Sequence, residues 1–388
     1  MKQKNTNQNT TKSKGIANSS KDKNAKTLLG FDEAIAEAFN NRGIIKYDLG
    51  DYVGAISDYN RAIEINPKDA EVYNNLGVAK DALGDNKSAI QHYDKAIKIN
   101  PKYSNAYYNR GIAKSELGEN KKAILDYDRA IKLNPEDAAA YSNRGLAKAE
   151  LGNYKAAISD YDRAIKINPD DVKAYSNRGV ARYTIGEYEN AILDYNKAIK
   201  LNPEDAITYY NRGLVKSDLG KFKESILDYD SAIEINPDDE AIYCNRGVSK
   251  SELGDYKKAI LDFDKAIKIN PEYAKAYYNR GLAKTYLRKY KESILDYNKA
   301  IKVNPNYAQA YSDRGVSNYI LGEIKKSISD YDKAIKINPN YAIAYYNRGL
   351  VKYELGNKDN TVSSDMKKAA KLGFKPAEDF HKEYFSKG

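Results

Sequence analysis

The sequence predicts an all-α protein built as a stack of antiparallel helix pairs, and two observations carry this prediction. The first is a period, because nine of the ten prolines recur every 34 residues, at positions 67, 101, 135, 169, 203, 237, 271, 305 and 339. A fixed period of this length indicates one small unit that is copied and stacked. The second is that each period holds two helix-length segments separated by a glycine. Such an array forms an elongated scaffold rather than a compact domain around a catalytic pocket.

One complete unit, NPKYSNAYYNRGIAKSELGENKKAILDYDRAIKLNP, shows how each helix is expected to begin and end. Asn100 is expected to be an N-cap, and Pro101 the first residue of a helix. That helix is expected to stop at Gly118, as helices often stop at a C-terminal glycine. Glu119 opens a second helix that ends near Leu133, and the next Asn-Pro restarts the cycle. Each unit is therefore predicted to be two antiparallel helices joined by a tight turn.

The chain divides into three predicted parts. Residues 1–30 are rich in Asn, Lys, Thr and Ser and are expected to be a disordered basic tail. Residues 31–372 hold ten tandem helix pairs, of which the tenth is degenerate. Residues 373–388 follow a Gly-Phe-Lys-Pro segment and are expected to form a capping helix, because the end of a solenoid needs a polar-backed cover.

Composition argues against several classes of protein. No apolar run is long enough to span a membrane, the N-terminus lacks the apolar stretch of a signal peptide, and a cytoplasmic location is expected. The only cysteine is Cys244, and the only histidines are His92 and His381. They supply no disulfide, metal cluster or nucleophile relay, and no Gly-rich phosphate loop interrupts the array. The sequence therefore predicts a protein that is not an enzyme and has neither cofactor nor metal.

The positive charge lies mostly in the predicted tail. Of the net charge of +10, residues 1–30 carry +6, which leaves only +4 for the remaining 358 residues. The alternative to a protein-binding function is association with nucleic acid through this tail and the rows of lysines in the repeats. The balanced charge of the array makes this the weaker hypothesis.

The repeats resemble the tetratricopeptide repeat family across roughly residues 32–372. The family pattern is an aromatic residue, then Leu-Gly, Tyr, Ala, an aromatic residue, Ala and Pro over 34 residues. In the third unit the matching residues are Tyr107, Gly111, Ala123, Tyr127, Ala130 and Pro135. The resemblance implies a right-handed superhelix of helix pairs that binds other proteins in a concave groove. Arginine replaces the family's leucine in nine units, and lysine, as at Lys46, Lys80 and Lys114, mostly replaces its tyrosine.

The repeated arginine is predicted to pair with a repeated aspartate in the second helix of the same unit. The candidate structural ion pairs include Arg110 with Asp126, Arg144 with Asp160, and Arg178 with Asp194. Each partner lies eight residues from the glycine of the turn, so an antiparallel hairpin sets the two at the same level. The second unit replaces both residues, by Leu76 and His92, whereas the tenth keeps Arg348 and has Ser364 at the aspartate position. An anion-binding ladder of arginines is the less favoured alternative.

A row of asparagines is expected to line the concave face of the first helices. Its members are Asn41, Asn75, Asn109, Asn143, Asn177, Asn211, Asn245, Asn279 and Asn347, with Asp313 as the exception. Carboxamides donate and accept hydrogen bonds, so such a row can hold the backbone of an extended peptide whatever its sequence. The other interpretation is that each asparagine bonds a neighbouring unit and only builds the scaffold. The sequence favours neither of the two.

Positions that vary between units are expected to set specificity. Tyrosines alternate with small or polar residues in one such row, at Tyr108, Tyr210, Tyr278 and Tyr346. Tyrosine provides contact area at low entropic cost, which suits an adaptable protein-binding surface. The sequence thus predicts a non-enzymatic scaffold or adaptor that binds an extended segment of another protein. It leaves the partner's identity and any self-association open.

Overall fold

The computed structural model describes residues 30–356 and 360–385. These residues form helices and turns, with no strand among them. The chain divides into two compact units, Met1–Glu187 and Tyr188–Gly388, and the division falls between the two helices of the fifth repeat. Apart from residue 30, which begins the first helix, the predicted tail lies outside the described residues. No helix in the described ranges is both long and apolar enough to cross a bilayer.

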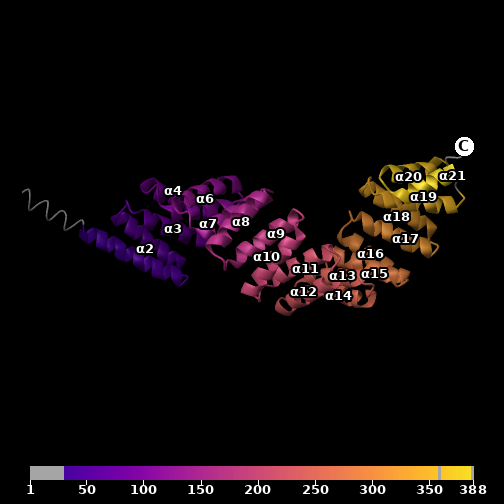
Figure 1. Ribbon diagram of the computed structural model, residues 1–388, viewed down its shortest axis with the longest axis horizontal. Helices are drawn as coiled ribbons and strands as arrows, with labels where there is room; N and C mark the ends of the chain where they lie inside the picture. Colours follow the sequence, from indigo (N-terminus) through magenta and orange to yellow (C-terminus); the bar gives the residue numbers. More distant parts are fainter. Residues whose placement is uncertain (1–29, 357–359, 386–388) are drawn as a thin grey trace, which may run out of the picture. The chain divides into compact units, whose positions relative to one another are not determined.

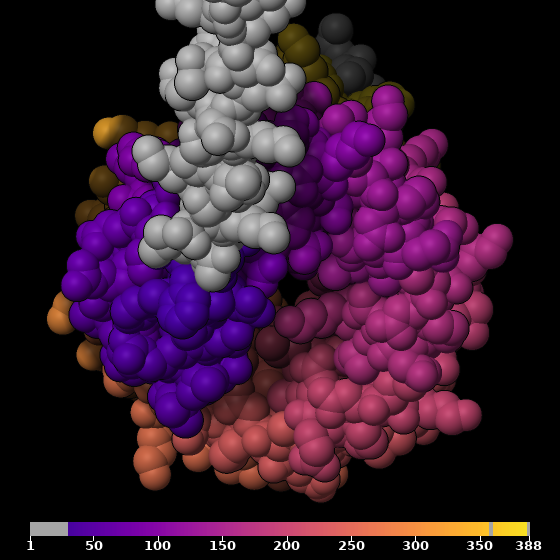
Figure 2. Space-filling view, turned by 90° about the vertical axis from the view of Figure 1, so that its left-hand side faces the viewer, coloured from indigo at the N-terminus to yellow at the C-terminus, as the bar shows by residue number. Residues whose placement is uncertain are grey.

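The first unit is a stack of helix hairpins that starts with a helix over residues 30–48. The helices that follow are α2 (Tyr52–Ile65), α3 (Ala70–Ala82), α4 (Asn86–Ile99), α5 (Ser104–Glu116), α6 (Asn120–Leu133), α7 (Ala138–Glu150), α8 (Tyr154–Ile167) and α9 (Val172–Thr184). Each of these helices contacts the next along the chain, and the first helices of successive repeats also contact one another, α3 with α5, α5 with α7 and α7 with α9 (Figure 1). Figure 2 shows the N-terminal side of this unit, where the indigo side chains form a closely packed surface.

The second unit repeats the same arrangement. Its helices are α10 (Tyr188–Leu201), α11 (Ala206–Asp218), α12 (Phe222–Ile235), α13 (Glu240–Glu252), α14 (Tyr256–Ile269), α15 (Ala274–Tyr286), α16 (Tyr290–Val303), α17 (Ala308–Ile320), α18 (Ile324–Ile337), α19 (Ala342–Glu354), α20 (Asn360–Lys371) and α21 (Lys375–Phe385). The fold class is therefore all-α, and each unit is an α-solenoid of antiparallel helix pairs. The predicted helix ends near Leu117 and Leu133 agree with α5 and α6 to within a residue.

The Asn-Pro dipeptide does not begin a helix, so that prediction is wrong. Asn100 is instead the C-cap of α4, and its backbone N–H donates to the carbonyl of Ala96. Its side-chain Oδ1 accepts from the backbone N–H of Lys102 at 3.0 Å, which is an Asx-turn across Pro101. The next helix begins only at Ser104. The asparagine side chain prefers the local turn, and proline, which has no N–H, closes off the helix before it.

The turn inside each repeat uses glycine for its conformation. Gly118 has a φ of 74°, and its N–H donates to the carbonyl of Ser115 at 2.8 Å. The N–H of Glu119 donates to the carbonyl of Lys114 at 2.8 Å. These two bonds form a Schellman motif, which satisfies the last carbonyls of α5 and turns the chain into α6.

Replacing Arg288 by glycine is expected to raise the unfolding free energy by about 1 kcal/mol. Arg288 occupies the glycine position in the α15–α16 turn and has a φ of 60°, a left-handed conformation that costs a residue with a Cβ. Urea unfolding of the two proteins measures the difference. Arg288→Ala serves as the control, because alanine removes the long side chain but keeps the strain. Equal midpoints for the wild type and Arg288→Gly would contradict this account.

The core of each repeat is a tyrosine ring packed against a glycine of the facing helix. Tyr127 in α6 is 1% exposed, and it lies between the small residues Ala123 and Ala130, both fully buried. A Cβ on Gly111 in α5 would be 2.6 Å from the Tyr127 ring, so only glycine admits the ring at this distance. Phe263 and Met366 take the place of the tyrosine in two repeats. The alternation of large and small residues lets the two helices approach closely.

Helix α21 packs on the last hairpin. Ala377 is fully buried with Met366 of α20, and the Phe380 ring meets the Tyr353 ring edge-on, with centroids 5.1 Å apart. The Phe374 ring, before α21, lies 5.0 Å from the ring of Tyr346. These contacts cover the apolar end of α19 and α20. The predicted capping segment thus holds a helix where a cap was expected.

Candidate functional site

The arginines and aspartates predicted to pair lie together in the described repeats. Arg110 Nε is 2.9 Å from Asp126 Oδ2, and its Nη2 is 2.5 Å from Oδ1, which is a bidentate geometry. Arg144 holds Asp160 in the same way, at 2.9 and 2.6 Å. Arg178 and Asp194 lie in different units, so their pairing stays a prediction.

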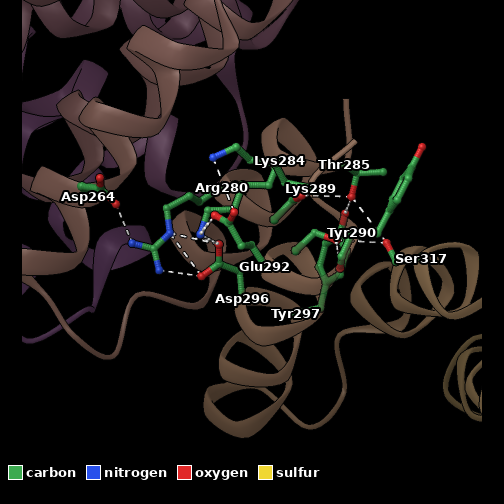
Figure 3. A network of polar contacts seen from close by, with 12 residues as sticks. Asp264, Arg280, Lys284, Thr285, Lys289, Tyr290, Glu292, Asp296, Tyr297 and Ser317 are labelled. Carbon is green, nitrogen blue, oxygen red and sulfur yellow. Dashed lines mark hydrogen bonds and ion pairs between the residues drawn. The ribbon is translucent and has the colours of Figure 1, made fainter. Parts of the chain in front are cut away.

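Two further groups join most of these pairs, and neither was predicted from the sequence. Lys284 places its Nζ 2.8 Å from Asp296, the aspartate that Arg280 also holds. Arg280 Nη1 also donates to Asp264 Oδ1 in α14, at 2.5 Å (Figure 3). The arginine therefore links its own helix pair to the preceding one. The signal was present in the sequence, since Asp or Asn recurs two residues after the aspartate position (His92 in the second repeat) in nine repeats: Asn60, Asp94, Asp128, Asp162, Asn196, Asp230, Asp264, Asn298 and Asp332.

Most lysines of the lysine row are neutralised by the same aspartates. Lys46, Lys114 and Lys148 each place Nζ 2.7 to 2.8 Å from the aspartate that the arginine holds. Because these ammonium groups already have an anionic partner, they offer little free charge for a phosphate backbone. The arrangement therefore weakens the nucleic-acid hypothesis for the described residues.

The second and tenth repeats show how the pair is replaced. In the second, Leu76 is 1% exposed, and the His92 ring stacks on the Tyr73 ring at 6.5 Å. Burial lowers the pKa of His92, so an apolar and a neutral aromatic residue replace two charges. In the tenth, Asp365 and not Ser364 accepts from Arg348 Nε, at 2.9 Å. Asp365 lies nine residues after Gly356, whereas the paired aspartate of the other repeats lies eight residues after the corresponding glycine.

The asparagine row lies on the first helices and joins consecutive repeats. Asn75 Nδ2 donates to Asn40 Oδ1 at 3.1 Å, and Asn109 donates to Asn74 at 3.0 Å. Each acceptor lies 35 residues earlier, in the first helix of the preceding repeat. Of the remaining members, Asn41 is exposed, whereas Asn177, Asn211 and Asn347 are half-buried. These bonds fit the scaffold interpretation, but they engage only the amide nitrogen and leave the carboxamide oxygen as a further acceptor.

The tyrosine row supplies acceptors for the same ladder. Asn143 donates to the hydroxyl of Tyr108 at 2.9 Å, and Asn245 donates to that of Tyr210 at 2.8 Å. The Tyr108 ring also lies 6.1 Å from the core ring of Tyr127. Tyr278 and Tyr346 are half-buried like the other two. These tyrosines are thus positioned by the scaffold while one edge of each stays accessible.

The same face is hollowed in the second unit. A cavity of about 190 Å³ lies between α13, α14 and α15, and its lining includes Asn279, Glu252 and Val248 from the first helices. The rings of Tyr256 and Tyr286 stack at its edge, 4.8 Å apart and nearly parallel. Asn279 Nδ2 reaches the buried Cys244 Sγ at 3.6 Å. The lining is therefore mixed, with apolar side chains, a carboxamide and a carboxylate.

A repeated helix hairpin with a polar ladder on its first helices defines a helical-repeat binding protein. Models of the family described as TPR repeat match residues 43–80, 82–118, 113–152, 147–186, 181–220, 250–285 and 317–356. A second model, Tetratricopeptide repeat, matches residues 206–239 and 274–307. The chain belongs to the tetratricopeptide repeat family.

The chain is also similar to several solved structures. A tetratricopeptide repeat protein from Parabacteroides merdae is 26% identical, with a TM-score of 0.48 over 67% of this chain and 99% of that one. MamA is 30% identical, with a TM-score of 0.39 over 42% of this chain and 94% of the other. The hetero-tetramer Cut9–Hcn1 matches at 16% identity and a TM-score of 0.50, over 81% of this chain and 76% of that one. No curated protein matches the sequence.

Proposed function

We propose that this protein is a non-enzymatic scaffold that binds an extended segment of a partner protein along the face formed by its first helices. The observation that carries the proposal is the ladder of half-buried carboxamides on this face, as in Asn109 and Asn143, held in place by the preceding repeats. A preorganised row of acceptors can bond the N–H groups of an extended backbone without a large entropic cost. The tetratricopeptide fold is that of a protein-interaction scaffold, and a cytoplasmic location is part of the proposal.

Two features distinguish the face formed by the first helices, which is proposed to bind the partner, from the rows of paired charges, which hold the scaffold together. The rows of arginine and lysine are largely neutralised within the scaffold, because Asp126, Asp160 and Asp296 each hold an arginine and a lysine. On the first-helix face, by contrast, the side chains change from repeat to repeat, as in the row that contains Tyr108, Ser142, Tyr210 and Cys244. Variation over a constant frame is what a sequence-selective binding surface requires.

Selection of a random 12-residue peptide library on the full-length protein tests the proposal. We expect peptides to be enriched, and we expect Asn75→Ala, Asn109→Ala and Asn143→Ala together to weaken the strongest of them by about tenfold, through loss of three hydrogen bonds. Fluorescence anisotropy measures the affinity, and thermal unfolding measures the stability of each variant.

Tyr108→Phe is the matched control. It removes the hydroxyl that Asn143 bonds and leaves the carboxamide in place. Binding that survives Tyr108→Phe but not Asn143→Ala supports a ligand role for the carboxamide. Equal effects of the two changes on stability, with no selective loss of binding, would assign the ladder to the scaffold alone and overturn the proposal.

A further inference from the structure

One position of the asparagine row has an aspartate instead, and there the direction of the hydrogen bond is reversed. Asp313 in α17 stands where nine repeats have asparagine. Where a tyrosine precedes it by 35 residues, the carboxamide donates to the tyrosine hydroxyl in two repeats, as Asn143 does to Tyr108 and Asn245 to Tyr210. Here the Tyr278 hydroxyl donates to Asp313 Oδ2, at 2.8 Å. A neutral donor on the binding face is thus replaced by an anionic acceptor.

Tyrosines surround this carboxylate. The Tyr307 ring lies against the Tyr278 ring, with centroids 4.8 Å apart. Burial first, and then the charges of Cys244 and Asp313, raise the pKa of Tyr307 to about 12. Burial and the charge of Asp313 likewise raise the pKa of Tyr341 to about 12. Three aromatic side chains from successive repeats therefore lie within the electrostatic reach of one carboxylate.

Two of these tyrosines take positions that elsewhere stabilise a helix. Asp137 caps α7, because its carboxylate accepts from the backbone N–H of Ala140 at 3.0 Å. Tyr307 and Tyr341 stand at the same place before α17 and α19, and neither helix has a side-chain bond at its N-cap. An aspartate cap ordinarily stabilises a helix. Helices α17 and α19 lack that stabilisation, and each has an aromatic ring on the binding face in its place.

No cation neutralises Asp313 within the described residues. Asp313 forms no ion pair within residues 30–356 and 360–385, and Lys275 Nζ bonds Asn245 Oδ1. Burial raises the pKa of Asp313 to about 6, and only the Tyr278 hydroxyl opposes that shift. The titratable groups whose pKa its charge raises are the five tyrosines Tyr278, Tyr297, Tyr307, Tyr331 and Tyr341. At neutral pH the site is a half-buried anion enclosed by aromatic rings.

We propose that Asp313, Tyr278, Tyr307 and Tyr341 bind a lysine or arginine side chain of the segment that lies along the first helices. The inference rests on the proposed function and adds a preference to it. A cation is attracted to the faces of tyrosine rings and to a carboxylate that lacks a cationic partner, and both attractions strengthen where water is partly excluded. An asparagine at this position would satisfy the ladder but would not attract a cation.

Parallel selections of the 12-residue library on the full-length wild type and on Asp313→Asn test the inference. We expect peptides from the wild type to be several-fold richer in Lys and Arg than those from Asp313→Asn. If neither protein enriches peptides, the proposed function fails and the inference fails with it. If both enrich peptides of equal basic content, the proposed function stands and the inference is overturned.

Affinity measurements on one selected peptide give the sharper result. We expect its affinity to fall about tenfold when its central Lys or Arg is changed to Gln, or when Asp313→Asn is made. Glu272→Gln is the matched control, since Glu272 is exposed and the change removes the same charge. Wild-type affinity is expected to fall as the pH drops below about 6, where Asp313 becomes protonated, and to stay level for Asp313→Asn.

Stability separates a ligand site from a structural role. The folded pKa of Asp313 is above its unfolded value, so the folded state holds the proton more tightly and loses stability as the pH rises from about 4 to about 6. Asp313→Asn removes that cost, and we expect it to raise the melting temperature at pH 7. A lower melting temperature would show that the carboxylate serves the fold and would overturn the inference.

Discussion

Arg144→Leu is expected to lower the unfolding free energy by about 3 kcal/mol. The arginine side chain is 16% exposed, and the Asp160 side chain that it holds is 6% exposed. Removing the guanidinium leaves this buried carboxylate with Lys148 alone and breaks the bond to Asp128 in the preceding repeat. Leaving a buried charge without its partner costs more free energy than the intact ion pair contributes to stability. Urea unfolding measures the change, as a shift in midpoint at unchanged slope.

The control for this prediction is the pair of residues found in the second repeat. Arg144→Leu with Asp160→His reproduces the combination of Leu76 and His92, which packs without the two opposing charges. We expect the double variant to be more stable than the sum of the single changes indicates, by about 1 to 3 kcal/mol. Additive effects of the two changes on stability would contradict the pairing. An equal loss of stability in the two single variants would not contradict it.

Gly111→Ala is expected to destabilise the protein by about 2 kcal/mol, although alanine is the better helix former by about 1 kcal/mol. The new Cβ would lie 2.6 Å from the Tyr127 ring, which is 1% exposed and enclosed by Ala123 and Ala130. Since the ring has no free space, the two helices must separate or the ring must leave its rotamer. Thermal and urea unfolding measure the loss.

Two further variants show whether the close approach is the cause. Asn105→Ala, at an exposed position of the same helix, tests helix propensity alone and is expected to leave stability unchanged or slightly raised. Tyr127→Leu is itself destabilising, but it removes the ring, so adding Gly111→Ala to it is expected to cost little more. A full additional loss in the Tyr127→Leu protein would refute the contact between ring and glycine.

Much of the fold follows from the 34-residue period. A unit of 34 residues has few ways to bury its apolar side chains. The positions of Gly118 and of the aromatic core residues were therefore sufficient to predict two helices and the turn between them. The role of Asn100 was predicted incorrectly because Ser, Asn and Asp bond the backbone both before and after a helix, and local sequence alone does not distinguish the two. In the tenth repeat the partner of Arg348 is Asp365, one residue beyond the position that the period of the other repeats predicts.

The candidate site was predicted only in outline. The period identified the asparagine row and the exception at Asp313, but it did not show that Asn75 and Asn109 bond the preceding repeats. Tyr307 and Tyr341 were missed, although each replaces a capping aspartate at the same spacing. Their significance depends on residues of neighbouring repeats, such as Tyr278, against which Tyr307 lies, and periodicity within one repeat does not reveal these contacts.

The sequence by itself determined the helix pairs, the length of each repeat, and the matched arginine and aspartate within a repeat. These depend on local propensity and on residues that one hairpin places at the same level. Only the tertiary structure decided that Arg280 also reaches Asp264, and that the hydroxyl of Tyr278 meets Asp313. These contacts join different repeats, and their geometry is set by how one hairpin packs on the next. That packing depends on the shapes of buried side chains such as Tyr127, and not on the order of residues within a unit.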